Sequence, residues 1–251
     1  MNIVNVISHR GASKRAPQNT MPAFEKAIML GADGFETDVH LSKDGVPVIC
    51  HNSTINATSD GKGKISSLTL EQLKKFDFGS YFSREFKDTQ LPTLEDFLSF
   101  AEGKGLKVLN IELKPEHNKK RRTELVHKTL DGVKEHKLED ILLISSFSPK
   151  ILKLCKEYSP ECKTAYLYPY SIFMFWQIFI PPYKLMQKLG CDAAHPHYLC
   201  IRGSFVEKCH ELGMRVNCWT VDEIQKMTDL IKANVDGIIT NTPDRLLNLF
   251  A

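Results

Sequence analysis

Two carboxylates, Glu36 and Asp38, stand two residues apart in the stretch from Gly31 to His51. If they lie on a β-strand, both side chains point to the same face, because successive strand side chains alternate between faces. Neighbouring carboxylates repel each other and lose hydration, and a bound cation relieves both effects. The pair therefore predicts half of a metal site, with His51 close by as an acid or a base.

A third carboxylate, Glu112, lies near the end of an apolar run over residues 107–113, and Lys114 follows it two positions later. On a neighbouring strand it would converge with the first two, and the three would offer only oxygen ligands. Such ligands suit a hard cation, Mg²⁺ or Ca²⁺, better than Zn²⁺, which draws in histidine or cysteine. The alternative is that the carboxylates form salt bridges with Arg10 and Lys114. We predict one divalent cation with these ligands: Glu36, Asp38 and Glu112.

Two histidines flank these acidic residues at predicted strand ends. An unperturbed histidine has a pKa of about 6.5, so His9 and His51 are the candidate acid and base. Either histidine alone would more often be structural, but their shared position beside the carboxylates favours catalysis. Arg10 and Lys114 provide positive charge for an anion, and arginine binds phosphate in a bidentate manner. Together these residues describe a phosphodiester hydrolase, in which one histidine activates the attacking oxygen and the other protonates the leaving oxygen.

Alternating apolar runs and amphipathic stretches must position these residues. We interpret the chain as eight strand-then-helix units. Such units indicate a parallel sheet, and eight of them favour an α/β fold of the closed (β/α)₈ type, a TIM barrel, over an open doubly wound sheet. The sequence after the first strand lacks a Gly-x-Gly-x-x-Gly or phosphate-loop motif, which lowers the dinucleotide-binding alternative. The predicted strands cover residues 2–8, 35–41, 107–113, 141–146, 164–168, 192–194, 214–219 and 236–240, with a return strand at 46–50.

Residues 52–92 interrupt this alternation, because they are polar and contain several glycines. We interpret them as a small insertion after the second strand region, between a strand and its helix. The whole chain, residues 1–251, is expected to form a single barrel domain. The predicted helices cover residues 21–30, 69–76, 93–103, 119–137, 149–158, 183–190, 204–213, 221–233 and 243–250.

The polar residues gather at one end of the predicted strands. In barrels of this type the active site lies at the C-terminal ends of the strands. The N-terminal ends carry no matching cluster, and this asymmetry is the strongest indication of an enzyme. The residues at or just after the C-terminal ends are His9, Arg10, Glu36, Asp38, His51, Glu112, Lys114, Ser145, Ser146, Phe147, His195, His197, Trp219, Thr220, Thr240 and Asn241.

The overall composition is that of an ordinary globular protein. A net charge of +3 is too small to indicate nucleic-acid binding, and no arginine-rich run with interleaved aromatic residues supports it. The seven cysteines form no Cys-x-x-Cys pair, and buried reduced thiols fit a cytoplasmic protein. The N-terminus lacks the pattern of a signal peptide. The longest apolar stretch, 172–182, is about half the roughly 20 residues that a transmembrane helix needs, so we expect no transmembrane segment.

Several of these motifs, in this order, resemble the glycerophosphodiester phosphodiesterase family. The resemblance runs nearly end to end, and the His-Arg-Gly and Glu-x-Asp motifs are its most specific parts. The family fold is an eightfold β/α barrel with a small insertion, which agrees with the strand count. The motifs are His9-Arg10-Gly11, Pro17–Thr20, Gly31–Val39, Asp44-Gly45, His51, Asn110–Lys114, Ser146-Phe147, Trp219–Val221 and Asp236–Pro243.

The resemblance implies hydrolysis of glycerophosphodiesters, such as glycerophosphocholine, to glycerol phosphate and an alcohol. It implies metal binding by the three carboxylates and acid/base roles for the two histidines. It also implies that Arg10 binds the phosphate, that Lys114 assists near the same anion and that Trp219 packs against the substrate. Either water or the substrate's own glycerol hydroxyl could attack first. The family usually has Glu where this chain has Gln18, and because Gln keeps its hydrogen-bonding capacity we expect activity to be retained.

An aromatic stretch, residues 166–182, follows the fifth strand and is expected at the mouth of the barrel. One interpretation is a lid or helix buried on the rim, or against a second subunit in a homodimer. The other is peripheral lipid contact through 172–182, which would favour a lysophospholipase D-like enzyme acting on acylated substrates. A catalytically silent barrel that binds phosphodiesters is a third alternative, and the intact set of histidines and carboxylates argues against it.

Overall fold

Eight parallel strands close into a barrel in the computed structural model, which describes residues 4–116, 118–169 and 182–250. Each strand pairs with the next along the chain, and β1 pairs with both β2 and β9, which closes the ring. A short strand, β3 (Pro47–Ile49), pairs antiparallel with β2 outside the ring. The predicted (β/α)₈ barrel is confirmed. The barrel strands are β1 (Asn5–His9), β2 (Gly34–Leu41), β4 (Val108–Leu113), β5 (Leu142–Ser146), β6 (Thr164–Tyr168), β7 (Ala193–Pro196), β8 (Arg215–Cys218) and β9 (Gly237–Thr240).

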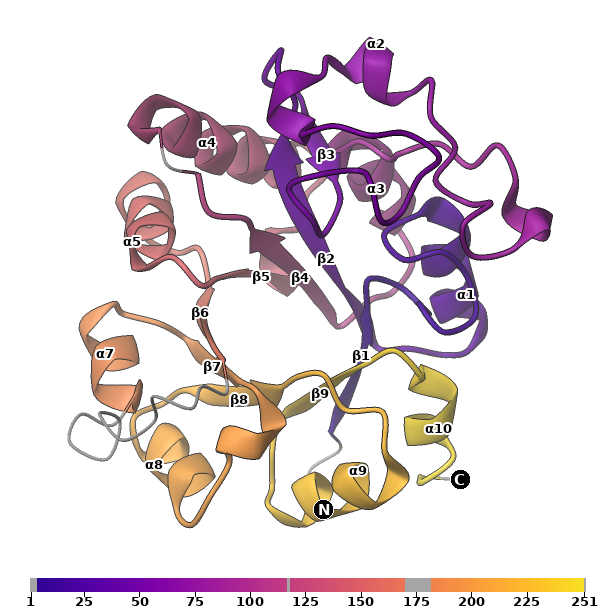
Figure 1. The fold of residues 1–251 in the computed structure, drawn as a ribbon. Coiled ribbons are helices and arrows are strands. Elements are labelled where there is room, and N and C mark those ends of the chain that lie inside the picture. Colours follow the sequence, from indigo (N-terminus) through magenta and orange to yellow (C-terminus); the bar gives the residue numbers. More distant parts are fainter. Residues whose placement is uncertain (1–3, 117, 170–181, 251) are drawn as a thin grey trace.

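Helices surround the barrel, as Figure 1 shows. Most lie where the sequence predicts them, but the helix predicted over 221–233 begins only at Ile224. The backbone N–H of Val221 instead donates to the carbonyl of Ile239, which keeps this segment extended beside β9. The helix predicted over 69–76 covers only Leu70–Leu73. The helices are α1 (Met21–Met29), α2 (Leu70–Leu73), α3 (Leu94–Ala101), α4 (Lys119–Glu135), α5 (Pro149–Tyr158), α7 (Pro182–Lys188), α8 (Phe205–Glu211), α9 (Ile224–Lys232) and α10 (Pro243–Leu247).

Strand β4 shows how a barrel strand serves both the core and the site. All six of its side chains are buried, as expected for a parallel strand covered on both faces. Leu109, Ile111 and Leu113 pack in the core between the sheet and its helices. Because strand side chains alternate, Asn110 and Glu112 face the barrel interior. The same alternation on β2 sends Glu36 and Asp38 inward.

Three phenylalanine rings fix the position of β2 against the outer helices. Phe24 of α1 lies 4.6 Å from Phe97 of α3 and 5.4 Å from Phe35 of β2, measured between ring centroids. Phe35 and Phe97 are 5.9 Å apart, and all three rings are fully buried. Burial of each such side chain stabilises the fold by about 1.5–3 kcal/mol. The strand that carries two site carboxylates is therefore anchored by its outward face.

The predicted insertion, residues 52–92, lies between β3 and α3 and has a small core of its own. A capping box at Thr69 and Gln72 begins its short helix α2. The core joins the insertion to β3, so the loop that carries His51 is held from both sides. Its buried members are Val48, Cys50, Ile55, Ile65, Leu73, Phe78 and Leu91.

Three further sequence predictions concern the surface and the thiols. All seven cysteines are unpaired and buried. Within the described ranges, no helix has the length and apolar character that crossing a membrane requires. The stretch 170–181 lies outside the described residues. It includes most of residues 166–182, for which a lid or a homodimer interface was predicted, and nearly all of 172–182, for which lipid contact was predicted.

Candidate active site

The site begins at a tight turn after β1. Arg10 and Gly11 both have positive φ, 57° and 76°. A Cβ on Gly11 would lie 2.6 Å from the carbonyl carbon of Ala23 in α1, so the position requires glycine. The backbone N–H of Arg10 donates to the carbonyl of Glu36 at 2.8 Å. The turn thus ties the end of β1 to β2 and places His9 and Arg10 at the barrel mouth.

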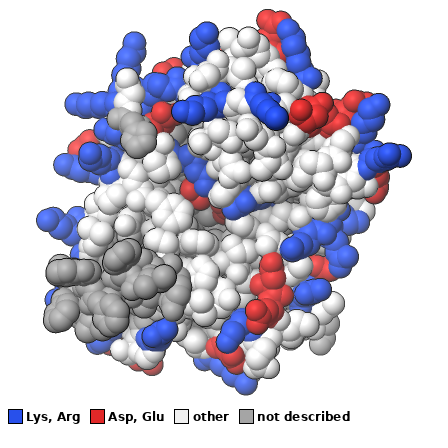
Figure 2. All heavy atoms as spheres, viewed as in Figure 1, with Lys and Arg blue, Asp and Glu red and all other residues white. Residues whose placement is uncertain are grey.

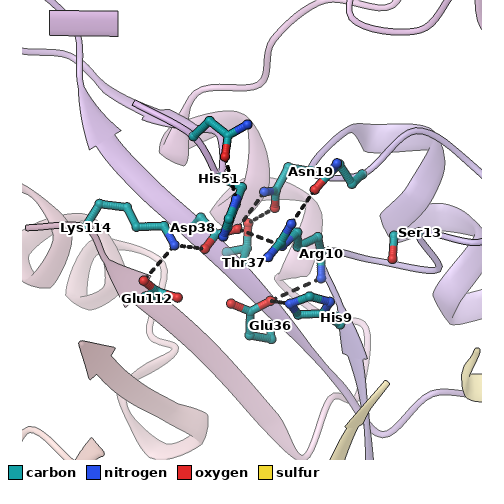
Figure 3. A network of polar contacts seen from close by, with 12 residues as sticks. His9, Arg10, Ser13, Asn19, Glu36, Thr37, Asp38, His51, Glu112 and Lys114 are labelled. Carbon is teal, nitrogen blue, oxygen red and sulfur yellow. Dashed lines mark hydrogen bonds and ion pairs between the residues drawn. The ribbon is translucent and has the colours of Figure 1, made fainter. Parts of the chain in front are cut away.

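The three predicted metal ligands lie together, as Figure 3 shows. Strands β2 and β4 pair so that Glu36 lies opposite Asn110 and Asp38 lies opposite Glu112. One carboxylate oxygen from each of Glu36, Asp38 and Glu112 lies within 4.8 Å of the others, and all three residues are buried. Three buried carboxylates at this spacing form a donor set that suits a hard divalent cation. The geometry fits the predicted metal site.

Asp38 is held by two ion pairs and one hydrogen bond. Its Oδ1 lies 2.7 Å from Lys114 Nζ, and its Oδ2 accepts a hydrogen bond of 2.8 Å from Asn19 Nδ2 and lies 3.3 Å from Arg10 Nε. Burial alone would raise the pKa of Asp38, but the charges of Lys114 and Arg10 lower it below its usual range. Asp38 is therefore a carboxylate throughout the physiological range. Thr37 Oγ1 donates to Asn19 Oδ1 at 2.9 Å and so orients the Asn19 amide.

The other two carboxyl groups have the opposite tendency. Burial, followed by the charge of Asp38, raises the pKa of Glu36 well above its ordinary value and that of Glu112 to about 7. Lys114 Nζ lies 2.6 Å from Glu112 Oε1. Lys114 thus bridges Asp38 and Glu112, so the salt bridges considered as an alternative coexist with the acidic cluster. Two cationic side chains face three carboxyl groups, which leaves the cluster short of positive charge.

His9 is oriented by a chain of hydrogen bonds. Its Nδ1 lies 2.7 Å from Asn241 Oδ1, and Asn241 Nδ2 donates to Asp222 Oδ2 at 2.7 Å. Because Asp222 fixes the Asn241 amide, we assign the proton of neutral His9 to Nδ1. Nε2 is left facing the site, 3.8 Å from Glu36 Oε2. Burial, followed by the charge of Arg10, lowers the pKa of His9 to about 3, so its ring is neutral.

His51 approaches the carboxylates from the loop after β3. Its Nδ1 lies 2.9 Å from Asn52 Oδ1, and its backbone carbonyl accepts a hydrogen bond of 3.3 Å from His40 Nε2. The preceding residue, Cys50, donates its N–H to the carbonyl of Asp38 at 3.0 Å. Burial lowers the pKa of His51, and the charge of Asp38 opposes this shift. His51 is partly exposed and lines the same cavity as His9.

A cavity of about 70 Å³ lies between these groups. Figure 2 shows a small group of acidic atoms recessed near the middle of this face, with basic atoms beside it. The opposite wall is apolar and includes Phe147 and Trp219, whose rings meet edge to face at 5.7 Å. Trp219 Nε1 donates to the carbonyl of His195 at 2.7 Å, which fixes the indole. The lining residues are His9, Arg10, Glu36, His51, Asn110, Glu112, Phe147, Leu167, Trp219 and Ile239.

All eight predicted site residues are therefore gathered in one region, with Asp38 and Lys114 bonded to residues that line the cavity. Sequence reasoning gave no role to the supporting residues Asn19, Asn52 and Asp222. Asn19 falls within a recognised motif, and Asp222 follows the Trp219-Thr220-Val221 run at the end of β8. Asn52 and Asp222 stand beside strand ends, which was a usable signal, whereas Asn19 lies ten residues after β1. The partners of Asn19 and Asp222 come from other strands and meet them only in the closed barrel, whereas Asn52 contacts its neighbour His51.

Comparison with known proteins supports the same conclusion. The model of the glycerophosphoryl diester phosphodiesterase family matches residues 9–245. A glycerophosphodiester phosphodiesterase of Caldanaerobacter subterraneus subsp. tengcongensis is 37% identical over 244 residues, 97% of this chain and 96% of the relative. A crystal structure from Silicibacter pomeroyi, provisionally described as a glycerophosphoryl diester phosphodiesterase, superimposes on this chain with a TM-score of 0.90. The two sequences are 26% identical, and the match covers 99% of this chain and 95% of that one.

A phosphodiesterase of Oleispira antarctica, solved in complex with the product sn-glycerol-3-phosphate, has a TM-score of 0.87 and 30% identity, covering 98% of this chain and 96% of that one. The barrel and its recessed acidic pocket define an enzyme of the phosphoric diester hydrolase class. The chain belongs to the glycerophosphodiester phosphodiesterase family.

Proposed function

We propose that the protein hydrolyses glycerophosphodiesters to glycerol phosphate and an alcohol, using one divalent cation and the histidines His9 and His51. The observation that carries this proposal is a group of three buried carboxylates, two of which line a cavity together with both histidines and Arg10. The product found in the Oleispira relative, sn-glycerol-3-phosphate, supports the substrate class.

Glu36, Asp38 and Glu112 would hold the cation, Mg²⁺ or Ca²⁺. When bound, the cation would neutralise negative charge on the phosphoryl oxygens and on the carboxylates themselves. Asn19 and Lys114 keep Asp38 in place and ionised. The raised pKa values of Glu36 and Glu112 reflect burial first and the crowding of carboxylates second, and a cation relieves both effects.

His9 and His51 have different surroundings, and we assign them different roles. In neutral His9 the proton resides on Nδ1 against Asn241, so Nε2 can accept the proton of the attacking oxygen, from water or from the glycerol hydroxyl. The new P–O bond forms as the bond to the leaving oxygen breaks. If the glycerol hydroxyl attacks, this step yields a cyclic phosphate, and water must open it in a second step to give glycerol phosphate. His51, in its imidazolium form, donates a proton to that leaving oxygen, so that the alcohol departs neutral and His51 is left neutral. The charge of Asp38 supports this role, because it favours the protonated form of His51.

Arg10 is suited to bind the phosphate. Its guanidinium has five N–H donors. Gln18 Oε1 accepts from Nη1 at 2.6 Å, and Asp38 Oδ2 lies 3.3 Å from Nε. These contacts orient the guanidinium toward the cavity that Arg10 lines and leave further donors for phosphoryl oxygens. Gln18 supplies this orientation without a charge, so Asp38 is the carboxylate that balances Arg10. Across the cavity, Trp219 and Phe147 would pack against the organic part of the substrate.

A direct test is to incubate the purified protein with glycerophosphocholine or with lysophosphatidylcholine, to measure cleavage of each, and to identify the products by ³¹P NMR. We expect glycerol phosphate from the first substrate. Turnover of the acylated substrate alone would replace this proposal with the lysophospholipase D-like alternative. Failure to cleave either diester, in the presence of Mg²⁺ or Ca²⁺, would contradict both.

The working compartment is also a proposal. All seven cysteines are buried and unpaired, which supports a reducing environment such as the cytoplasm. No feature of the described surface supports a nucleic-acid partner, and the predicted homodimer stays a prediction.

A further inference from the structure

Asn110 is a buried side chain in the cavity to which the proposed mechanism gives no role. It lies on β4, is fully buried and lines the cavity with Glu36, Glu112 and His9. Within the described ranges, neither its Oδ1 nor its Nδ2 has a hydrogen-bond partner. By contrast, the amide of Asn241 is paired at both atoms. Leaving an amide unpaired in the interior is unfavourable, which points to a ligand group as its partner.

The strand register places Asn110 in the deeper part of the site. Along β2 and β4, the pair Asp38 and Glu112 lies nearer the C-terminal ends, and the pair Glu36 and Asn110 lies one step further in. Lys114 contacts both members of the outer pair. Because positive charge gathers at the outer pair, the phosphate is expected there, and a neutral part of the substrate is expected beside Asn110.

The chemistry of this deeper part matches a hydroxyl on a short carbon chain. A side-chain amide both donates and accepts, as does a hydroxyl, whereas a phosphate oxygen needs donors and a cation needs acceptors. Leu167 and Ile239 line the same cavity and offer apolar contact to carbon atoms. The volume of about 70 Å³ exceeds the roughly 10–15 Å³ that one water needs, so a small polyol fragment can enter.

We propose that Asn110 is a specificity-determining residue that binds a free hydroxyl of the glycerol moiety. It thereby selects glycerol phosphodiesters over diesters that lack this hydroxyl. This inference rests on the proposed function and specifies how the substrate is recognised.

The test compares binding of glycerol 3-phosphate with that of its two deoxy analogues, 1,2-propanediol phosphate and 1,3-propanediol phosphate. Each is measured as a competitive inhibitor, so that the comparison does not depend on the chemical step. Wild-type protein should bind glycerol 3-phosphate about five- to tenfold more tightly than the analogue that lacks the contacted hydroxyl. In Asn110→Leu this preference should disappear, so that glycerol 3-phosphate and that analogue bind with about equal affinity. The preference for glycerol 3-phosphate over the other analogue should be unchanged. A preference that survives in Asn110→Leu would overturn the proposal.

Two controls separate this role from others. Asn110→Leu should unfold at the same temperature as wild type or higher, because an apolar side chain of similar size removes the unpaired amide. A clear loss of stability would indicate a structural role instead and would count against the proposal. Ser145→Ala is the matched variant, since Ser145 is also fully buried with an unpaired hydroxyl but is not among the cavity-lining residues. It should keep the wild-type preference.

Cation affinity, measured by isothermal titration calorimetry, provides a readout besides activity. Asn110→Leu should bind Mg²⁺ or Ca²⁺ within about twofold of wild type, because the carboxylates are the expected ligands. A loss of about tenfold or more would make Asn110 a cation ligand and overturn the proposal. If wild-type protein cleaves no glycerophosphodiester, the proposed function fails. If it cleaves them and Asn110→Leu keeps the preference, only this inference fails.

Discussion

At the scale of single residues, the two histidines differ in how the protein holds them. His9 is mostly buried, with 12% of its side chain exposed, and is bonded to Asn241, whereas His51 lies on a loop and is bonded to its neighbour Asn52. The sequence could identify both histidines, because each follows a predicted strand. It could not identify their partners, since Asn241 lies 232 positions from His9 and meets it only when β1 and β9 pair.

Replacing His51 tests its catalytic role. His51→Ala should lower turnover of glycerophosphocholine by about 10²–10⁴-fold, because positioned proton transfer contributes that much to rate. Its half-buried position on a loop predicts little change in thermal unfolding temperature. The matched control is His127→Ala, since His127 stacks on Tyr158 away from the site and should keep full activity. A fully active His51→Ala would remove His51 from the mechanism.

Asn241 is expected to act as a positioning residue through His9. In Asn241→Ala, His9 loses the acceptor of its Nδ1 proton, so the tautomer that presents Nε2 is no longer favoured. We expect kcat to fall by about tenfold or more with little change in KM. The ¹⁵N chemical shifts of the His9 ring should also change toward a mixture of tautomers. Unchanged kcat and ring shifts would show that Asn241 does not orient His9.

At the scale of elements, β2 and β4 build the acidic cluster by their register. An apolar run predicted β4, and the alternation of side chains predicted that Glu36 and Asp38 of β2 share one face. The register itself, with Asp38 opposite Glu112, depends on how the strands are staggered in the closed barrel. The bounds of α9 were predicted less well, because the long-range backbone bond from Val221 to Ile239 overrides local helix preference.

The phenylalanine cluster behind β2 predicts a stability effect. Phe97→Ala should lower the free energy of unfolding by about 3–5 kcal/mol, because it leaves a cavity beside two other buried rings. Phe82→Ala, in the insertion, provides a control. Because Phe82 is 38% exposed, this substitution should lower the free energy of unfolding far less. Urea denaturation followed by circular dichroism measures both. Equal costs for the two variants would contradict the anchoring role assigned to Phe97.

At the scale of the whole molecule, barrel closure explains why a dispersed set of residues forms one site. The rule that active sites lie at the C-terminal strand ends was sufficient to predict the residues that converge. The sequence also raised salt bridges between Lys114 and the carboxylates, but only as an alternative to the metal site. That Lys114 contacts Asp38 and Glu112 at once, and that Asn110 is left unpaired, depends on packing between strands. The single-domain organisation of residues 1–251 stays a prediction.

The raised pKa of Glu112 links cation binding to pH. In the cation-free protein this pKa is about 7 instead of 4.5, so the folded state binds this proton more tightly than the unfolded chain does. The contribution of Glu112 to stability therefore falls as pH rises between these values, and a cation must displace the proton below about pH 7. Added Ca²⁺ or Mg²⁺ should raise the unfolding temperature more at about pH 8 than at about pH 5.5. Glu112→Gln should weaken this pH dependence. If the cation raises the unfolding temperature of the wild-type protein more at the lower pH, the link between Glu112 protonation and cation binding is contradicted.

The central claim is that the three buried carboxylates hold a cation that the reaction requires. The most direct measurement is glycerol phosphate release from glycerophosphocholine before and after dialysis against EDTA, followed by return of Mg²⁺ or Ca²⁺. We predict a loss of at least about a hundredfold on chelation and recovery when one of these cations is returned. In Glu36→Gln, which removes one ligand charge, recovery should require more cation. Full activity after thorough chelation would contradict the claim.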